Sequence, residues 1–299
     1  MKPTKQLRTL IDAPDICAMP GVYDALSARI AEQAGHRAAF LGGFAATGAT
    51  LAEPDSSQLS LTEMADHTAR ICDAVSIPIL ADADTGFGNV TNVRRTVKLF
   101  ERAGAGGILI EDQVFPKRCG HTPGKAIIPV EDMVAKVKAA VDAREDGDFI
   151  ILARTDAIAV EGIEAAIDRA NLFREAGADL LFIEAPRTLA QMRRICGEVE
   201  GRHLANMVDF GMTPELTTRE LQDIGFSAAI WPVSALLAVT RTLQDFMRAL
   251  AAEGTSKSQQ DRMVTFDAFT GLVGLPSLRT REQADLDAAA SLIGAHKKH

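Results

Sequence analysis

The segment PKRCGHTPGK, residues 116–125, places a thiol among cations and a histidine. Positive neighbours lower the pKa of a cysteine, and such a thiol can act as a nucleophile or as an acid–base group. Cys119 lies in this polar setting. The other three cysteines, in contrast, lie in apolar runs that are typical of buried thiols: Cys17, Cys72 and Cys196. We therefore expect Cys119 to be the reactive thiol of the chain.

A second chemical segment is ADADTGFGN, which holds Asp82 and Asp84. Residues two apart on a strand point to one face, and two carboxylates held so close repel each other without a cation. Mg²⁺ takes oxygen ligands, keeps several waters and uses only one or two protein carboxylates. The pair predicts a magnesium site, with Glu111 at the end of the next strand as a third member through bound water. In the alternative without a metal, Asp82 caps the following loop and Asp84 is solvated.

Polar side chains also end three later apolar strands: Arg154 in LARTDA, Glu184 in FIEAP and Asn206 in LANMVDFG. An arginine can bind a substrate carboxylate through two parallel hydrogen bonds, and the other two groups can orient polar substrate atoms. The alternative for Arg154 is a simple ion pair with Asp156. If these strands are parallel neighbours, all three side chains meet at one edge.

The elements that must position these groups alternate regularly. Short apolar runs are each followed by a stretch whose apolar residues recur at three- and four-residue intervals, as in amphipathic helices. Eight such runs occur, at residues 16–21, 38–43, 78–84, 106–112, 149–155, 179–185, 203–208 and 228–233. Eight strand–helix units are typical of an α/β protein with a (β/α)8 TIM barrel. An open doubly wound sheet is the alternative, but GVYDA after the first run is a poor phosphate-binding turn.

A weak internal repeat supports the barrel. Four helical segments lead into a strand through a glycine suited to a helix C-terminus: Gly35, Gly104, Gly177 and Gly225. Seven residues after each glycine come, in turn, Gly42, Glu111, Glu184 and Pro232. Equivalent positions on alternate strands of a barrel form one layer, so we expect these four residues at the barrel mouth.

Composition limits the class of protein. The 299 residues are 47% hydrophobic, and 32 basic against 40 acidic residues give a net charge of −8, which does not favour nucleic acid as a partner. A signal peptide and an apolar run of about 18 residues are both absent, so we expect a cytoplasmic protein with no membrane partner. The repeat predicts a catalytic barrel over residues 1–254. Residues 255–299 are expected to form a helical extension that packs on the barrel or on a neighbouring subunit, and we favour the neighbour.

Several motifs occur in a fixed order along nearly the whole chain: PGVYDALSAR, FLGG, EPD, ADADTGFGN, IEDQ, KRCGH, ARTDA, IEAP and NMVDFG. In this set the chain resembles the isocitrate lyase and phosphoenolpyruvate mutase superfamily, and KRCGH (117–121) resembles the signature of its carbon–carbon lyases. The resemblance implies a TIM barrel that uses Mg²⁺, with Mn²⁺ as a substitute. It also implies a homotetramer in which C-terminal helices are swapped between paired subunits.

The resemblance further implies which residues act. Metal binding falls on Asp82, Asp84 and Glu111, with Asp84 the closest to the ion. Substrate binding falls on Gly42, Gly43, Lys117, Gly120, His121 and Asn206. Catalytic roles fall on Cys119, Arg154, Glu184 and Asp55, the last of which lies near the reacting hydroxyl.

The implied reaction is a retro-aldol cleavage of a 2-hydroxy di- or tricarboxylate, in which Cys119 protonates the departing enolate. The leading candidate substrate is 2-methylisocitrate, which gives pyruvate and succinate. The next candidates are 2,3-dimethylmalate, which gives pyruvate and propionate, and related 2-hydroxy diacids. FLGG at residues 40–43 is closer to the oxaloacetate decarboxylase branch, so a decarboxylase or hydrolase acting on oxaloacetate is an alternative. A phosphonopyruvate or phosphoenolpyruvate mutase activity and a binding barrel without catalysis are further alternatives.

Overall fold

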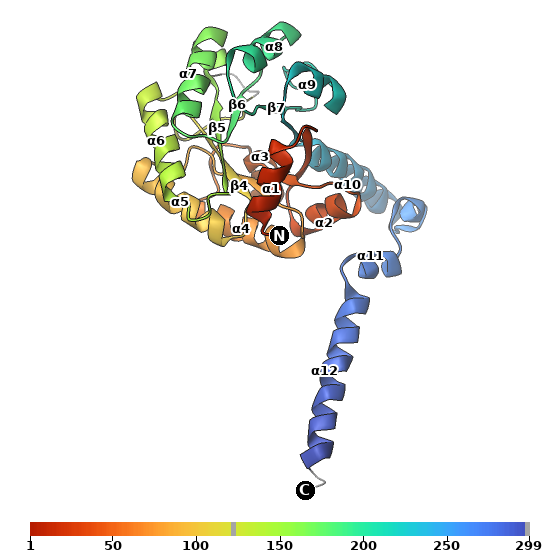
Figure 1. The fold of residues 1–299 in the computed structure, drawn as a ribbon. Coiled ribbons are helices and arrows are strands. Elements are labelled where there is room, and N and C mark those ends of the chain that lie inside the picture. The colour runs from red at the N-terminus through yellow and green to blue at the C-terminus, as the bar shows by residue number, and fades with distance from the viewer. Residues whose placement is uncertain (121–123, 297–299) are drawn as a thin grey trace. The chain divides into compact units, whose positions relative to one another are not determined.

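The computed structural model describes residues 1–120 and 124–296, with side chains to residue 293. Met1–Val239 form one compact unit, and the chain from Thr240 onward forms a second. The first unit contains eight strands (Figure 1): β1 Cys17–Val22, β2 Ala39–Leu41, β3 Ile79–Asp82, β4 Gly107–Glu111, β5 Ile150–Thr155, β6 Leu180–Ile183, β7 Leu204–Asn206 and β8 Ala228–Trp231.

The strands form one parallel sheet in the order β6-β5-β4-β3-β2-β1-β8-β7. A parallel bridge between Leu181 of β6 and His203, which directly precedes β7, brings the two ends of the sheet together. The predicted TIM barrel is therefore confirmed. Helices lie on the outside of the strands: α2 Ala25–Gln33, α3 Gly43–Leu51, α4 Leu61–Ala74, α5 Val90–Arg102, α6 Val130–Ala143, α7 Ile163–Glu175, α8 Leu189–Glu198 and α9 Thr218–Ile224. The next helix, α10 Ser234–Glu253, begins in the first unit and continues into the second.

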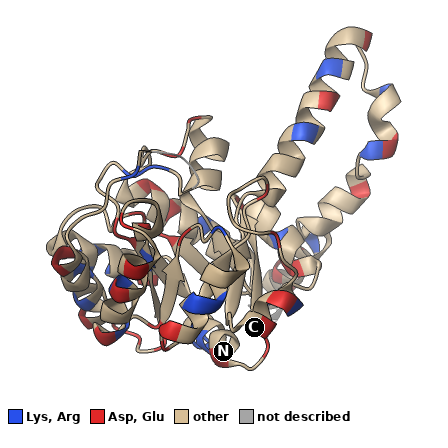
Figure 2. Cartoon of the chain, turned by 90° about the horizontal axis from the view of Figure 1, so that it is seen from above, with Lys and Arg blue, Asp and Glu red and all other residues tan. Residues whose placement is uncertain are grey.

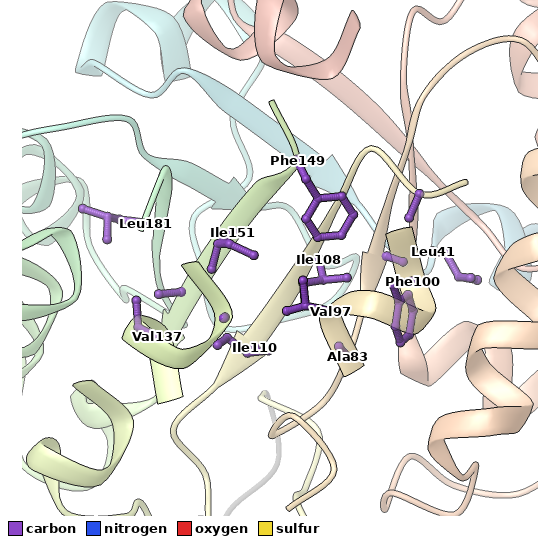
Figure 3. Packing of buried hydrophobic residues seen from close by; sticks show 14 of the residues in the cluster. Leu41, Ala83, Val97, Phe100, Ile108, Ile110, Val137, Phe149, Ile151 and Leu181 are labelled. Atoms are coloured by element: carbon purple, nitrogen blue, oxygen red, sulfur yellow. The ribbon is translucent and has the colours of Figure 1, made fainter. Parts of the chain in front are cut away.

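Apolar residues pack in two layers around the barrel wall. The outer layer lies between strands and helices, where Ile108 and Ile151 of the strands lie with Phe100 of α5 and Val137 of α6 (Figure 3). The strand residues that point to the opposite side fill the barrel interior. Because each strand is buried on both faces, its sequence is a continuous apolar run.

An N-terminal helix, α1 Pro3–Asp12, packs against the barrel interior and closes its N-terminal end. Proline starts the helix, and Leu7, Leu10 and Ile11 follow at helical spacing, so they form one apolar face. All three side chains are buried in the interior cluster. Burial of such a side chain contributes about 1.5–3 kcal/mol. The sequence analysis did not predict this helix.

The four glycines of the internal repeat lie at helix C-termini, as the repeat predicted. Gly35, Gly104 and Gly177 directly follow the capping residues of α2, α5 and α7, and Gly225 caps α9. Their φ angles lie between +85° and +119°, a conformation that residues with a side chain rarely adopt. The prediction of helix-ending glycines before β2, β4, β6 and β8 is confirmed.

The end of β3 differs from the prediction. The strand ends at Asp82, and Asp84 has φ +48°, in the left-handed region, so the two aspartates do not share a strand face. The backbone turns here because the amide of Asp84 donates a 2.9 Å hydrogen bond to Oδ1 of Asp82. Their carboxylates still approach each other, through this turn instead of through strand geometry.

The second unit consists of the rest of α10 followed by η2 Lys257–Arg262, α11 Phe266–Leu272 and α12 Leu275–His296. We keep the division into a catalytic barrel to residue 254 and an extension from residue 255 as a proposal. Across the described residues, no helix is long and apolar enough to span a bilayer. On the face seen in Figure 2, basic and acidic residues are interspersed over the helices.

Candidate active site

A cavity of about 240 Å³ is lined by residues at and after the C-terminal ends of the strands. Ten of the residues predicted from the sequence line it: Gly42, Gly43, Asp55, Asp82, Lys117, Cys119, Gly120, Arg154, Glu184 and Asn206. Asp84 and Glu111 lie directly beside these residues. His121, the remaining predicted residue, lies outside the described residues.

The start of α3 holds the aspartates of the β3 turn. The amide of Gly43, the first residue of α3, donates a 2.9 Å hydrogen bond to Oδ2 of Asp82. A helix N-terminus carries partial positive charge and favours a carboxylate there. A Cβ atom at Gly43 would lie 3.1 Å from the Asp82 carboxylate and 3.2 Å from that of Asp84, so glycine leaves the room that both acids occupy.

Lys117 lies among these acids, with its side chain only 4% exposed. Its Nζ lies 2.7 Å from Asp55 and 3.2 Å from Oδ1 of Asp84. Burial alone would lower the pKa of Lys117, but the carboxylates of Asp84, Asp82 and Asp55 raise it well above its usual value. Burial raises the pKa of Asp84 to about 6, against the opposing effect of Lys117. The sequence analysis placed Lys117 in the site but did not predict these partners.

Arg154 connects three acids at the next strand ends. Its Nε lies 3.2 Å from Glu111 and 2.8 Å from Asp156, and its Nη2 lies 3.1 Å from Glu184. The guanidinium carbon lies 5.1 Å from the centre of the Phe182 ring, within the range of a cation–π contact. The ion pair with Asp156 is therefore present, but it is one of several contacts that fix the guanidinium.

Two buried acceptors beside Arg154 have no hydrogen-bond partner in the described structure: Oε1 of Glu111 and Oδ1 of Asn206. The Nδ2 of Asn206 donates to Glu184 at 3.2 Å. Burial raises the pKa of Glu111 well above its usual range, although Arg154 and Lys117 oppose the effect. Buried acceptors normally have a donor, so both atoms are suited to a ligand or to bound water.

The acidic side of the cavity fits a hydrated divalent cation. Within residues 1–120 and 124–296, no three His, Cys, Asp or Glu side chains are grouped closely enough to hold a metal ion. Mg²⁺ does not require such a cage, because it keeps several waters and takes one or two carboxylates. Asp84 can serve as the direct ligand, and Asp82 and the unpartnered Oε1 of Glu111 can accept hydrogen bonds from bound water.

A layer of charged groups under the cavity was missed by the sequence analysis. Lys125 donates to Oδ1 of Asp156 at 2.8 Å and to the carbonyl of Gly120. Asp112 accepts hydrogen bonds from the backbone amide of Asp156 at 3.0 Å and from the hydroxyl of Thr155 at 2.6 Å. Lys125 ends the polar segment 116–125, which could have marked it as a site residue. Its partner Asp156 lies 31 residues away, so the sequence did not indicate the pairing.

The cavity also has apolar lining residues. They come from β2, α3, β6, β8, α10 and the loops after β7 and β8: Phe40, Phe44, Phe182, Val208, Phe210, Ile230, Val233 and Leu237. Phe210 is fully exposed and has φ +60°. The cavity therefore combines a charged wall with a wall suited to an alkyl group.

Comparisons with known proteins show what the chain is similar to. The family model for phosphoenolpyruvate phosphomutase matches residues 7–251. The chain is 41% identical over 282 residues to the 2,3-dimethylmalate lyase of Eubacterium barkeri, which covers 94% of this chain and 98% of the relative. It is 43% identical over 295 residues to the 2-methylisocitrate lyase of Aeropyrum pernix, covering 99% and 95%.

Solved structures show the same fold. A crystal structure of 2,3-dimethylmalate lyase, described as a PEP mutase/isocitrate lyase superfamily member, matches with a TM-score of 0.90 and 32% identity, covering 95% of this chain and 96% of that one. Oxaloacetate acetylhydrolase in complex with 3,3-difluorooxalacetate matches with a TM-score of 0.89 and 30% identity, covering 97% of each chain. Phosphonopyruvate hydrolase in complex with oxalate and Mg²⁺ matches with a TM-score of 0.85 and 29% identity, covering 95% and 99%.

Proposed function

Because this chain belongs to the phosphoenolpyruvate phosphomutase family, within the isocitrate lyase and PEP mutase superfamily, we propose that it is a Mg²⁺-dependent carbon–carbon lyase. Its substrate is a 2-hydroxy dicarboxylate, which it cleaves by retro-aldol chemistry. The observation that carries the proposal is one cavity lined by the acids beside β3, by Arg154 and by Cys119. The reaction needs groups that bind a charged substrate, accept the proton of its hydroxyl and donate a proton to the departing carbon, and these groups can do so.

The chain's own residues divide the reaction between them. Asp84, with Asp82 and Glu111 through bound water, would hold a divalent cation, which would supply a Lewis acid to the substrate. Asp55, held by Lys117, accepts the proton of the reacting hydroxyl. The carbon–carbon bond then breaks, its electrons pass to the departing carboxylate fragment as an enolate, and the Sγ–H of Cys119 protonates the enolate carbon. Arg154, with Glu184 and Asn206 beside it, orients that fragment's carboxylate.

The walls of the cavity favour an alkyl-substituted dicarboxylate over a tricarboxylate. Among the described lining residues, Lys117 and Arg154 are the two cations, and both already contact carboxylates of the protein. A third substrate carboxylate would have no further described cation of the lining to pair with, whereas a methyl group is suited to the apolar lining residues. We therefore propose 2,3-dimethylmalate as the substrate, with pyruvate and propionate as products.

A second candidate is 2-methylisocitrate, with pyruvate and succinate as products. The observation in its favour is the relative from Aeropyrum pernix, a 2-methylisocitrate lyase that is 43% identical over almost the whole chain.

A time course followed by NMR tests the proposal. The purified protein with Mg²⁺ is incubated separately with 2,3-dimethylmalate, 2-methylisocitrate and oxaloacetate. Pyruvate and propionate from the first are the expected result. Pyruvate and succinate from the second, at a higher kcat/KM, would move the assignment to the tricarboxylate. Turnover of oxaloacetate alone would overturn the lyase proposal in favour of an oxaloacetate decarboxylase or hydrolase, the activity that the segment FLGG indicates.

We also propose that the protein is a homotetramer in which the C-terminal helices pack on neighbouring subunits. The support is the apolar surface of the second unit, where several large side chains are at least half exposed: Met247, Val264, Phe266, Leu286, Leu292 and Ile293. Exposed apolar patches of this kind mark interaction surfaces. Light scattering after size exclusion should give the mass of four chains, and the mass of one chain would contradict the proposal.

A further inference from the structure

Lys125 is a buried cation that the reaction above does not use. Its side chain is 2% exposed, and its ammonium group bridges two parts of the chain. One partner is the carboxylate of Asp156, at 2.8 Å, and the other is the backbone carbonyl of Gly120, at 2.5 Å. A buried ammonium is stable only where acceptors of this kind surround it.

The first partner leads to the substrate-orienting arginine. Asp156 accepts hydrogen bonds from both Nε and Nη2 of Arg154, at 2.8 and 3.1 Å, through the same carboxylate that Lys125 contacts. Asp156 itself is fully buried, and its amide donates to Asp112. The carboxylate therefore links Lys125 to Arg154 in a fixed geometry.

The second partner leads to the cysteine. Gly120 directly follows Cys119, and its backbone lies against the Arg154–Glu184 ion pair. A Cβ atom at Gly120 would lie 2.3 Å from Nη2 of Arg154 and 2.7 Å from Oε2 of Glu184. Nothing larger than glycine fits in this place, so the main chain at residue 120 rests directly on the arginine. A hydrogen bond to the Gly120 carbonyl consequently helps to set where Cys119 lies.

We propose that Lys125 is a positioning residue that aligns Cys119 with Arg154. One ammonium group holds the backbone next to the proton donor and, through Asp156, the guanidinium that orients the substrate. This role rests on the proposed function, since it concerns the geometry between donor and substrate. A displacement of about 1 Å in such a site can lower a rate by about 10²-fold.

The test must separate positioning from simple stabilisation, because removal of any buried cation destabilises a protein. The chain offers a matched control at the other end of the barrel. Nη1 of Arg144 also bridges a backbone carbonyl and a carboxylate, those of Phe149 at 2.9 Å and Asp179 at 2.5 Å. Arg144→Met therefore removes the same kind of bridge at a distance from Cys119.

The first readout is the reactivity of Cys119, which needs no substrate. The rate of alkylation of Cys119 by iodoacetamide is measured by peptide mass spectrometry in the wild type, Lys125→Ala and Arg144→Met. We expect the rate to change several-fold in Lys125→Ala and to stay at the wild-type value in Arg144→Met. If Lys125→Ala does not fold, Lys125→Gln is measured instead. Equal rates in all folded variants would overturn the proposal.

The second readout is kcat and KM, measured with and without an added small amine that can replace the lost ammonium group. We expect kcat of Lys125→Ala to fall by about 10²-fold, more than KM rises, and ethylammonium ions to restore part of kcat by filling the vacated space. A kcat equal to that of Arg144→Met would overturn the positioning role. If the wild-type protein cleaves none of the proposed substrates, the proposed function fails, and the alkylation rates still decide whether Lys125 positions Cys119.

Discussion

The two ends of the barrel use the same charged residue types in different ways. At the N-terminal end, α1 covers the interior, and cations pair with acids in partly exposed bridges such as Arg8 with Asp179 at 2.8 Å and Lys2 with Asp146 at 3.1 Å. At the C-terminal end, acids with buried side chains outnumber the buried cations: Asp55, Asp82, Asp84, Glu111, Asp112, Asp156 and Glu184 against Lys117, Lys125, Arg154 and Arg169. The N-terminal end is paired, and the C-terminal end has an excess of buried acids, which suits the proposed divalent cation.

The backbone shows the same contrast. The turns that enter β2, β4, β6 and β8 use glycine for their positive φ angles. The loops that leave the strands instead place Asp84, Phe87, Ala185 and Phe210 in that region. A residue with a side chain is strained there by about 1–3 kcal/mol, and such strain is typical of functional sites. The comparison indicates that strained residues gather at the end that holds the proposed active site, while the other end is unstrained and paired.

The largest effect should follow from replacing Cys119, the proposed proton donor. Cys119→Ser should lower kcat by about 10³-fold, because an alcohol is a far weaker acid than a thiol and positioned acid–base groups contribute 10²–10⁴-fold. Product formation is measured by NMR, with thermal unfolding as the check on folding. Cys196→Ala is the control: burial raises the pKa of that thiol to about 12, so it should not act, and activity should stay near wild type. Near-full turnover by Cys119→Ser would show that another group protonates the enolate.

A smaller effect is expected at the acidic cluster. Asp84→Asn removes the charge of the proposed direct ligand and should weaken Mg²⁺ binding by about 10²-fold, since a hard cation depends on the few carboxylates it contacts. Calorimetric titration of the protein without substrate measures this affinity. Asp146→Asn, at the paired end, should bind Mg²⁺ as the wild type does. Unchanged affinity in Asp84→Asn would mean that the metal site lies elsewhere.

The barrel and most of its site could be predicted from the sequence because both depend on local signals. Strands that are buried on both faces appear in the sequence as apolar runs. Because the C-terminal ends of parallel barrel strands converge, Glu111, Arg154 and Glu184 lie together in the structure. Each of these residues is placed by its own strand. Their meeting follows from the fold alone.

The rest depends on loop paths, which periodicity does not encode. Lys117 and Asp55 are 62 residues apart and meet because two loops fold over the barrel mouth. We expected Asp84 to lie on the same strand as Asp82, but Asp84 itself has a left-handed conformation after β3 and turns the chain. The role of α1 was missed because the sequence of a short amphipathic helix does not indicate which surface its apolar face packs against.

At the paired end, the expected change is in stability and not in rate. Arg144→Met breaks a bridge between Asp179 and the carbonyl of Phe149, both partly buried. Loss of hydrogen bonds to a charged group should lower the free energy of unfolding by about 1–3 kcal/mol. Urea unfolding measures the loss, and kcat measured at a temperature where the variant is folded should match the wild type. A large fall in kcat would break the division of labour between the two ends.

The smallest effect concerns a histidine at the same end. His203, directly before β7, is 2% exposed, and its Nε2 lies 2.8 Å from the carbonyl of Val199. Burial lowers its pKa below the usual 6.5, so below pH 6.5 the unfolded chain binds a proton that the folded chain does not. The free energy of unfolding should therefore fall as the pH drops from 7.5 to 5.5, and His203 should account for up to about 1 kcal/mol of the fall.

His203→Gln can keep the hydrogen bond to Val199 but cannot take up a proton, so its stability should depend less on pH by that amount. Urea unfolding at pH 7.5 and 5.5 gives the difference for each protein, and His36→Gln, at an exposed histidine before β2, is the control. An unchanged pH dependence in His203→Gln would show that another group causes the loss of stability in acid. Since the pKa of Asp84 is raised to about 6, protonation there would stabilise the metal-free fold as the pH falls, which is the opposite sign. The sign of the measured slope thus shows which end of the barrel governs its response to acid.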